Sequence, residues 1–356
     1  MRGEIRIGNL SVGAGQPCVF IADIGANHDG NYERAVSLIH QAAAASADIV
    51  KFQHFRADHI VSQFGFDSLK MKLSHQHQWK QSVYDVYKSA SLSWEWTESL
   101  AEVAREVGIE FMSTPYDLAA VDHLDTFVPA YKVGSGDIPW DAMLLHVASK
   151  NKPILLATGA SSIGEVQHAA DLILEQTTEL ILMQCNTNYT GASDNFEHVH
   201  LNVLKTYRAM YPDCLLGLSD HTPGHAAVLG AIALGAVAIE KHFTDDTTRV
   251  GPDHGFALDP IAWREMVDRS RELEAALGCG RKFVAENEEE TVIVQRRCLR
   301  AARPMDQGHV LREDDIDVLR PSPPDGIEPN RIEEMIGKPL RRSIEASSHL
   351  TWDDIA

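Results

Sequence analysis

The chain has 356 residues, of which 44% are hydrophobic and 23% charged, so it can form one large folded domain and a small one. Its formal net charge is −19, and a surface this acidic repels nucleic acid and anionic membranes, which excludes both as expected partners. The five cysteines form no Cys-x-x-Cys pair, and the N-terminus lacks the apolar core of a signal peptide. We therefore expect a cytoplasmic protein without a disulfide framework.

Short apolar segments typical of buried parallel strands alternate with longer amphipathic segments typical of helices. In chain order the predicted strands are Cys18–Asp23, Asp48–Gln53, Glu110–Thr114, Ala130–Gly134, Pro153–Thr158, Leu180–Cys185, Leu215–Ser219 and Ala238–His242. The predicted helices are Tyr32–Ala45, Trp94–Val107, Leu118–Phe127, Trp140–Ser149, Ile163–Glu175, Leu201–Tyr211, Gly224–Leu234 and Ile261–Leu277. Eight β-α units favour a closed (β/α)8 TIM barrel over an open doubly wound sheet, and no Gly-x-Gly-x-x-Gly motif follows the first strand.

One insert interrupts this alternation in the second crossover. It runs from Phe55 to Ser93 and contains His75, His77, Trp79, Tyr84 and Tyr87. The sequence leaves three interpretations open, namely a lid, a dimer contact and a solvated excursion.

The alternation stops near Gly278, where a glycine-rich and then acidic stretch follows. We predict a barrel domain over residues 1–280, a linker over 281–291 and a small C-terminal domain over 292–356. The small domain contains a weak repeat, because Arg303–Ile316 and Arg342–Ile355 both carry a Leu, two further residues and then Asp-Asp-Ile. This repeat predicts a pseudo-symmetric fold.

Barrel enzymes place their catalytic groups at the carboxyl ends of the strands. Polar side chains gather at these ends in the sequence: Asp23, Lys51, Gln53, Thr114, Lys132, Ser135, Asp137, Thr187, Tyr189, Ser219, His221, Glu240 and His242. Because chance would scatter such residues along the strands, we expect a single polar site at that end of the barrel.

Two lysines, Lys51 and Lys132, stand inside apolar segments, where a lysine is rarely buried unless it is paired. One interpretation is an internal ion pair, whose partners would be Asp23, Asp137 or Glu240. A second is a cationic site for a phosphate or carboxylate, which neighbouring hydroxyls and glycine amides would support. A third is a lysine that forms a Schiff base.

Two histidines, His221 and His242, end neighbouring predicted strands. Imidazoles in this arrangement can share a metal ion with oxygen ligands, which suits Mn²⁺, Fe²⁺ or Zn²⁺ and leaves positions open for substrate. Glu240 points to the same side of its strand as His242, so it could orient or ligate the metal. Asp253, in the following loop, could hydrogen-bond a polyol or be an ordinary turn aspartate.

With these residues in hand, the chain resembles the sialic acid (N-acetylneuraminate) synthase family. The matching segments span the barrel: ADIGANHDG (22–30), VKFQ (50–53), STPYD (113–117), VPAYKVGSGD (128–137), LLATGAS (155–161), GLSDHT (217–222) and IEKHFTDDTTRVGPDH (239–254). The tail, with IGKPLRR and LTWDDI, resembles the antifreeze-like (SAF) domain of that family. The combination of GLSDHT with EKHFTD is the most specific of these signals.

The resemblance implies a transferase that condenses phosphoenolpyruvate with an N-acylated hexose, such as N-acetylmannosamine, to give a nonulosonic acid and phosphate. It implies a divalent metal on His221 and His242, with Mn²⁺ first and Mg²⁺ or Co²⁺ as alternatives. We expect catalytic roles for Asp23, Lys51, Lys132, His221, Glu240 and His242. We expect substrate contacts from Gln53, Thr114, Ser135, Asp137, Thr187, Tyr189, Ser219, Asp253 and Arg320. Arg320 would reach the sugar in the partner subunit of a domain-swapped homodimer.

This chain departs from the family pattern near the sugar. The family usually has Glu where Asp23 and Asp137 stand, and Asn-x-Tyr-Pro where this chain reads Thr187-Asn188-Tyr189-Thr190. The acceptor could therefore be a diacetamido hexose of the legionaminic or pseudaminic type, or a smaller aldose. A metal-free aldolase with a Schiff base on Lys132 and a non-catalytic sugar-acid-binding protein are the remaining alternatives.

Overall fold

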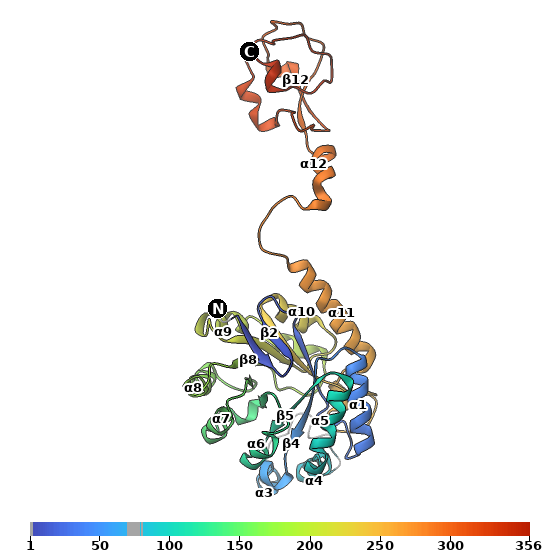
Figure 1. Cartoon of the computed structure of the whole chain (residues 1–356), viewed down its shortest axis with the longest axis vertical. Helices are drawn as coiled ribbons and strands as arrows, with labels where there is room; N and C mark the ends of the chain where they lie inside the picture. The colour runs from blue at the N-terminus through green and yellow to red at the C-terminus, as the bar shows by residue number, and fades with distance from the viewer. Residues whose placement is uncertain (1–2, 70–78, 80) are drawn as a thin grey trace. The chain divides into compact units, whose positions relative to one another are not determined.

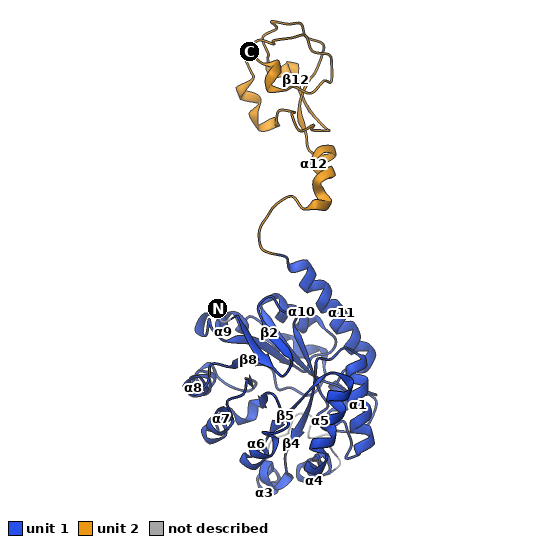
Figure 2. Ribbon diagram, viewed as in Figure 1, with its two compact units in different colours: residues 1–278 blue, residues 279–356 orange. Residues whose placement is uncertain are grey.

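The computed structural model describes residues 3–69, 79 and 81–356, and it divides into two compact units, residues 1–278 and 279–356 (Figure 2). Each unit contains its own cluster of buried hydrophobic side chains. His75 and His77 of the predicted insert lie outside the described residues.

The first unit is a closed barrel of parallel strands, so the predicted TIM barrel is confirmed (Figure 1). Its strands are β3 (Val19–Asp23), β4 (Ile49–His54), β5 (Glu110–Pro115), β6 (Tyr131–Val133), β7 (Ile154–Ala157), β8 (Leu180–Cys185), β9 (Leu215–Asp220) and β10 (Ala236–His242). Each overlaps a predicted strand. β10 closes the barrel against β3, which brings His242 into register with Asp23.

Helices surround the barrel. They are α1 (Tyr32–Ala44), α5 (Thr97–Val107), α6 (Leu118–Leu124), α7 (Asp141–Ala148), α8 (Ile163–Leu174), α9 (Val203–Met210), α10 (Ala226–Ala233) and α11 (Pro260–Leu277). Their starts follow local capping chemistry: the Asn31 side chain accepts from Arg34 N at α1, and Ser162 and Glu165 form a capping box at α8. The buried face of each helix packs on the outward side chains of the strands in one continuous core.

An N-terminal hairpin, which the sequence analysis did not predict, packs against the barrel interior. It consists of β1 (Glu4–Ile7) and β2 (Leu10–Gly13) in antiparallel pairing. Ile5, Ile7 and Val12 are fully buried and join an inner core with Ile21 and Met112. Four-residue strands carry too few alternating positions for a periodic signal, so the hairpin becomes recognisable only once the barrel is present.

The insert forms short helices in its described part, α2 (Ala57–Ile60), α3 (Gln63–Ser68) and α4 (Val83–Ala90). Figure 1 shows α3 and α4 close together at one end of the barrel. Of the helices in the described ranges, none is long and apolar enough to span a membrane.

The second unit shows the sequence repeat in its structure. Besides α12 (Glu289–Gln295), it contains an antiparallel pair of strands, β11 (Cys298–Ala301) and β12 (Ile316–Leu319). Arg303 forms an ion pair with the buried Asp315, and Arg342 forms the equivalent pair with the buried Asp354. Each aspartate also accepts a backbone N–H three residues before it, which fixes both copies of the turn in the same way.

A buried ion pair joins β9 and β10 on the side of the strands away from the barrel interior. Lys241 Nζ lies 2.5 Å from Asp220 Oδ2 and 2.6 Å from Thr222 O. Asp220 Oδ1 also accepts from Thr222 N at 3.0 Å, and all three side chains are buried. The pair therefore fixes the backbone on both sides of His221.

We expect Lys241→Met to lower the free energy of unfolding of the barrel by about 3–5 kcal/mol, because Asp220 would stay buried without its counter-charge. Urea denaturation of the full chain, followed by circular dichroism, would measure this. Lys205→Met, at an exposed position of α9, is the matched control and should change stability by less than about 0.5 kcal/mol. Equal stability of the two variants would show that the pair contributes little.

Candidate active site

A cavity of about 370 Å³ opens at the carboxyl ends of the barrel strands. Side chains from the site predicted in sequence line it: Asp23, Lys51, Gln53, Thr114, Lys132, Ser135, Asp137, Tyr189, Ser219, His221, Glu240 and His242. They come from strands all around the barrel, or from the residues directly after them. Barrel closure therefore brings residues that are far apart in sequence around one small volume.

Three residues predicted for the site are not among those that line this cavity. Asp253 lies nearby, since its Oδ2 accepts from Ala26 N at 2.9 Å and is 3.7 Å from His242 Nδ1. Thr187 packs directly on Gly159, since a Cβ built on Gly159 would lie 2.5 Å from the methyl carbon of Thr187. Arg320 belongs to the second unit.

Both buried lysines form ion pairs inside the cavity. Lys51 Nζ lies 2.8 Å from Asp23 Oδ2, and Lys132 Nζ lies 3.1 Å from Glu240 Oε1. Burial alone would lower the pKa of Lys51, but the charges of Asp23 and Glu240 outweigh it and raise that pKa. Lys132 also sits in an ion pair rather than in the dry, uncharged surroundings that activate a Schiff-base lysine.

Hydroxyl and amide groups complete the surroundings of these ion pairs. Thr114 Oγ1 lies 3.1 Å from Lys51 Nζ, and Ser219 Oγ donates to Glu240 Oε1 at 3.2 Å. Gln53 Nε2 donates to Asp23 Oδ2 at 3.0 Å. The cavity wall therefore offers ammonium and hydroxyl donors together, which are the groups that bind phosphates and carboxylates.

The two histidines face one another with ring centroids 5.5 Å apart. His221 Nδ1 donates to Asn186 O at 2.8 Å, because a carbonyl can only accept, and this leaves the lone pair of its Nε2 available. Burial, followed by the neighbouring His242, lowers the pKa of His221 to about 3, so its ring is neutral. His242 Nδ1 is buried without a hydrogen-bond partner.

This arrangement fits metal ligation by imidazole. A ligating histidine is neutral and donates its other N–H to a fixed acceptor, as His221 does to Asn186. Across the described ranges, no group of three or more His, Cys, Asp or Glu side chains is arranged to hold a metal ion by itself. Two imidazoles would therefore need oxygen ligands from substrate or water, which leaves positions open for chemistry.

Asp137 differs from the paired carboxylates. Its Oδ2 is buried without a hydrogen-bond partner, and burial raises its pKa from 3.8 to about 6, against the opposing charge of Lys132. Asp23, by contrast, has a lowered pKa, since the effect of burial is outweighed by the charges of Lys51 and His242 together with the hydrogen bonds from Lys51 and Gln53. Asp137 is thus suited to carry a proton near neutral pH, whereas Asp23 stays ionised.

The sequence analysis missed some of the residues that line the cavity. Tyr116 and Cys185 stand at strand ends, where the rule that identified their neighbours would have found them. Ile60 and Tyr87 come from the insert. No pattern in the sequence places them there, because only the folded crossover brings α2 and α4 to the cavity.

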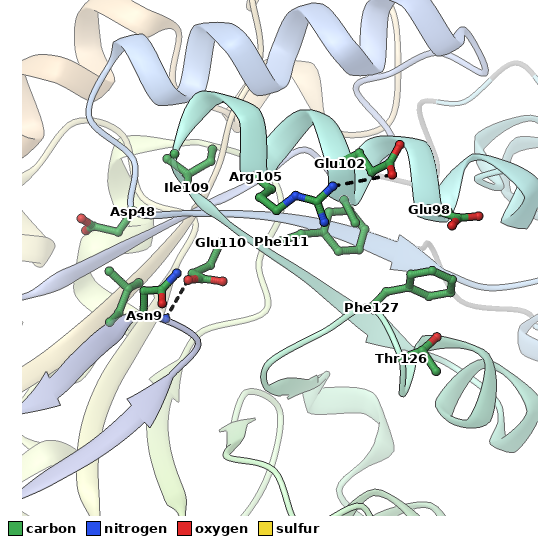
Figure 3. Close-up of a pocket in the computed structure, with 13 residues that line it drawn as sticks. Asn9, Asp48, Glu98, Glu102, Arg105, Ile109, Glu110, Phe111, Thr126 and Phe127 are labelled. Carbon is green, nitrogen blue, oxygen red and sulfur yellow. Dashed lines mark hydrogen bonds and ion pairs between the residues drawn. The ribbon is translucent and has the colours of Figure 1, made fainter.

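A larger cavity, of about 680 Å³, lies beside α5 at the amino-terminal end of β5 (Figure 3). Glu110 there accepts from Asn9 N at 2.8 Å, which ties the N-terminal hairpin to β5. Its lining contains Asp48, Glu98, Glu102 and Glu110 against a single guanidinium, Arg105. Such a surface repels an anionic substrate, and none of the residues predicted for the site lines it.

The raised pKa of Asp137 predicts that the stability of the fold depends on pH. Protonation of this carboxyl stabilises the fold, a contribution that is complete below about pH 4 and is lost as the pH rises through about 6. The Asp137→Asn variant lacks the ionisable group. The melting temperature of the variant minus that of the unmodified protein should therefore increase between about pH 5 and about pH 8. Thermal melts across this pH range measure the difference, and Asp194→Asn, at an exposed position, is the control. A difference in melting temperature between Asp137→Asn and the unmodified protein that does not change with pH would contradict the prediction.

The barrel and the tail match two known families. Residues 38–282 match the NeuB family, and residues 296–356 match the SAF domain. The chain is 33% identical over 349 residues to the N,N'-diacetyllegionaminic acid synthase of Legionella pneumophila, covering 96% of each chain. It is 30% identical over 335 residues to the human N-acetylneuraminate-9-phosphate synthase, covering 94% of this chain and 91% of that one.

A solved structure shares this architecture. The sialic acid synthetase of Leptospira borgpetersenii serovar Hardjo-bovis, in complex with citrate, superposes with a TM-score of 0.71 at 27% identity. The match covers 82% of this chain and 96% of that one. Sequence and structure agree, and the chain therefore belongs to the NeuB family, as a synthase-type enzyme with a C-terminal SAF domain.

Proposed function

We propose that this enzyme condenses phosphoenolpyruvate with an N-acylated hexose to give a nonulosonic acid and inorganic phosphate. The observation that carries the proposal is the meeting of two ion-paired lysines and two facing histidines around one cavity. The names of the relatives, synthases of legionaminic acid and of N-acetylneuraminate 9-phosphate, support it.

Phosphoenolpyruvate carries both a carboxylate and a phosphate, so it needs more than one cation in a protein with a net charge of −19. Lys51 and Lys132 would supply them. Each ammonium has three donors, so each can bind the substrate while it keeps its contact with Asp23 or Glu240. The neighbouring hydroxyls that would complete this half of the site belong to Thr114, Ser135 and Ser219.

We further propose that His221 and His242 hold a divalent metal, Mn²⁺ first, with Mg²⁺ or Co²⁺ as alternatives. When bound there, the metal would supply Lewis-acid polarisation of the acceptor's aldehyde oxygen. The hydrogen bond from His221 to Asn186 O would keep that ring in the ligating tautomer. Gln53, Thr187, Tyr189 and Asp253 would surround the hexose.

The reaction forms a carbon–carbon bond between the methylene carbon of phosphoenolpyruvate and the aldehyde carbon of the acceptor. Water adds to the enol carbon, and the bond between that carbon and the bridging oxygen breaks, so that phosphate leaves with this oxygen. Asp137, with its raised pKa, would donate a proton, whereas Asp23 would stay ionised beside Lys51. Holding both substrates in one cavity would supply much of the rate through effective concentration.

The purified protein should release phosphate from phosphoenolpyruvate only when an N-acylated aldose and Mn²⁺ are both present, and EDTA should abolish the release. His221→Ala should lower turnover by at least about a hundredfold at any metal concentration, since one of the two proposed metal-binding imidazoles is lost. His40→Ala, at an exposed position of α1, is the control. If EDTA does not reduce the release of phosphate and borohydride traps pyruvate on a lysine, the protein is an aldolase. If phosphoenolpyruvate binds but no phosphate is released, the protein is non-catalytic.

We also propose a domain-swapped homodimer in which Arg320 of one protomer contacts the acceptor in the other. Arg320→Ala should then raise the acceptor KM far more than the phosphoenolpyruvate KM, whereas Arg341→Ala, an exposed control in the same unit, should change neither. A 1:1 mixture of the Arg320→Ala and His221→Ala chains should regain about a quarter of the wild-type activity, because about half of the dimers that form at random are mixed and each of these has one intact site of two. Equal effects on both KM values, or no regain, would contradict the assignment.

A further inference from the structure

An aromatic side chain that the sequence analysis did not single out, Phe256, packs against both facing histidines. The centroid of its ring lies 4.9 Å from that of His242 and 5.9 Å from that of His221, and in both pairs the ring planes meet at 73°. Tyr189 packs on the same rings, with its centroid 5.5 Å from that of Phe256 and 4.5 Å from that of His221. Edge-to-face contacts at such distances are an arrangement that aromatic rings prefer. The two imidazoles and the two further aromatic rings therefore form one packed cluster.

Backbone hydrogen bonds couple the position of Phe256 to that of His242. Leu258, two residues after Phe256, donates its N–H to His242 O at 2.9 Å, and Thr244 N donates to Leu258 O at 3.0 Å. These bonds pair Leu258 in parallel with Phe243, directly beyond the end of β10. The segment that carries Phe256 is therefore fixed against the strand that carries His242.

The turn that contains Phe256 is also held by side-chain contacts. It is the short helix η5 (His254–Phe256). His254 is fully buried, with Nδ1 2.7 Å from Thr244 Oγ1 and Nε2 3.0 Å from Asp29 Oδ1. From the loop after β8, Gly191 approaches so closely that a Cβ built on it would lie 3.0 Å from Phe256 Cβ. Contacts on both sides therefore hold Phe256 in place.

The two histidines differ in what fixes the orientation of their rings. His221 Nδ1 donates to a backbone carbonyl at 2.8 Å, and this hydrogen bond sets the orientation of the ring. His242 Nδ1 is buried without a hydrogen-bond partner, and the carboxylate oxygens of Asp23 and Asp253 lie 3.5 Å and 3.7 Å from the ring nitrogens of His242. At these distances a hydrogen bond is too long to hold a ring firmly. Among the described residues, the closest ring contact of His242 is the one with Phe256.

We propose that Phe256 is a positioning residue for the metal site, because its ring limits the rotation of the His242 imidazole before a divalent cation arrives. The inference rests on the metal site of the proposed function, in which His221 and His242 hold the cation. An imidazole that rotates freely must lose this freedom when it binds a metal ion, whereas an imidazole held by packing has already lost it. The apolar ring also keeps water away from the sides of the imidazoles, which is a further way in which neighbours tune a metal site. Loss of the Phe256 ring should therefore weaken metal binding itself.

Titration of MnCl₂ into the full-length protein, with the free aqua ion measured by electron paramagnetic resonance, tests the proposal. The site is identified as the binding that His221→Ala removes. Phe256→Ala should raise the Kd of this site at least about tenfold, the smaller of the effects usual when a neighbour of a metal ligand is lost. Phe256→Leu keeps an apolar side chain without a ring and should raise the Kd at least about threefold, whereas Phe256→Tyr keeps the ring and should stay within about twofold of the unmodified protein. Phe64→Ala, at a position that is 84% exposed, is the matched control and should leave the Kd unchanged.

The outcomes separate this inference from the proposed function. An unchanged Kd in folded Phe256→Ala would overturn the inference, and so would a Phe256→Leu variant that binds Mn²⁺ as tightly as the unmodified protein. If Phe256→Ala does not fold, the result for Phe256→Leu decides. If the unmodified protein shows no Mn²⁺ binding that His221→Ala removes, the proposed metal site is overturned and this inference with it. Phosphate release from phosphoenolpyruvate by the same protein decides the condensation separately.

Discussion

The burial of charge at the open end of the barrel is the constraint on which the rest of this site depends. An isolated ammonium or carboxylate would be too costly to bury, so Lys51 pairs with Asp23 on the neighbouring strand and Lys132 pairs with Glu240 on the opposite side of the barrel. These pairs require β3, β4, β6 and β10 to lie in one closed ring, since their partners come from different strands. Closure of the barrel and assembly of the site are therefore the same structural event.

Side chains alternate along a strand, so the two faces of β10 carry residues with different roles. Glu240 and His242 face the cavity, while Lys241 faces away and pairs with Asp220. The outward pair holds the backbone around His221, and the inward pair would supply a cation for the anionic substrate that we propose. One short strand thus serves both the support of the site and its chemistry.

The cavity contains two chemical environments. Its lining combines ammonium and hydroxyl donors with tyrosine rings and Ile60. Two substrates of different polarity can therefore be held in one volume with a defined orientation. The unpaired carboxyl of Asp137 lies among these groups, where burial keeps it ready to carry a proton.

Much of this protein could be predicted from its sequence. Apolar segments of strand length alternate with amphipathic ones, and polar residues follow the strands, so the barrel and residues such as Lys51 and His221 are encoded in local pattern. Tertiary structure alone decided the rest. The N-terminal hairpin is too short to produce a periodic signal, and Ile60 reaches the cavity only because the folded insert packs against it. The pairing of Lys132 with Glu240 also depends on the distance across the closed barrel, and sequence spacing does not contain that distance.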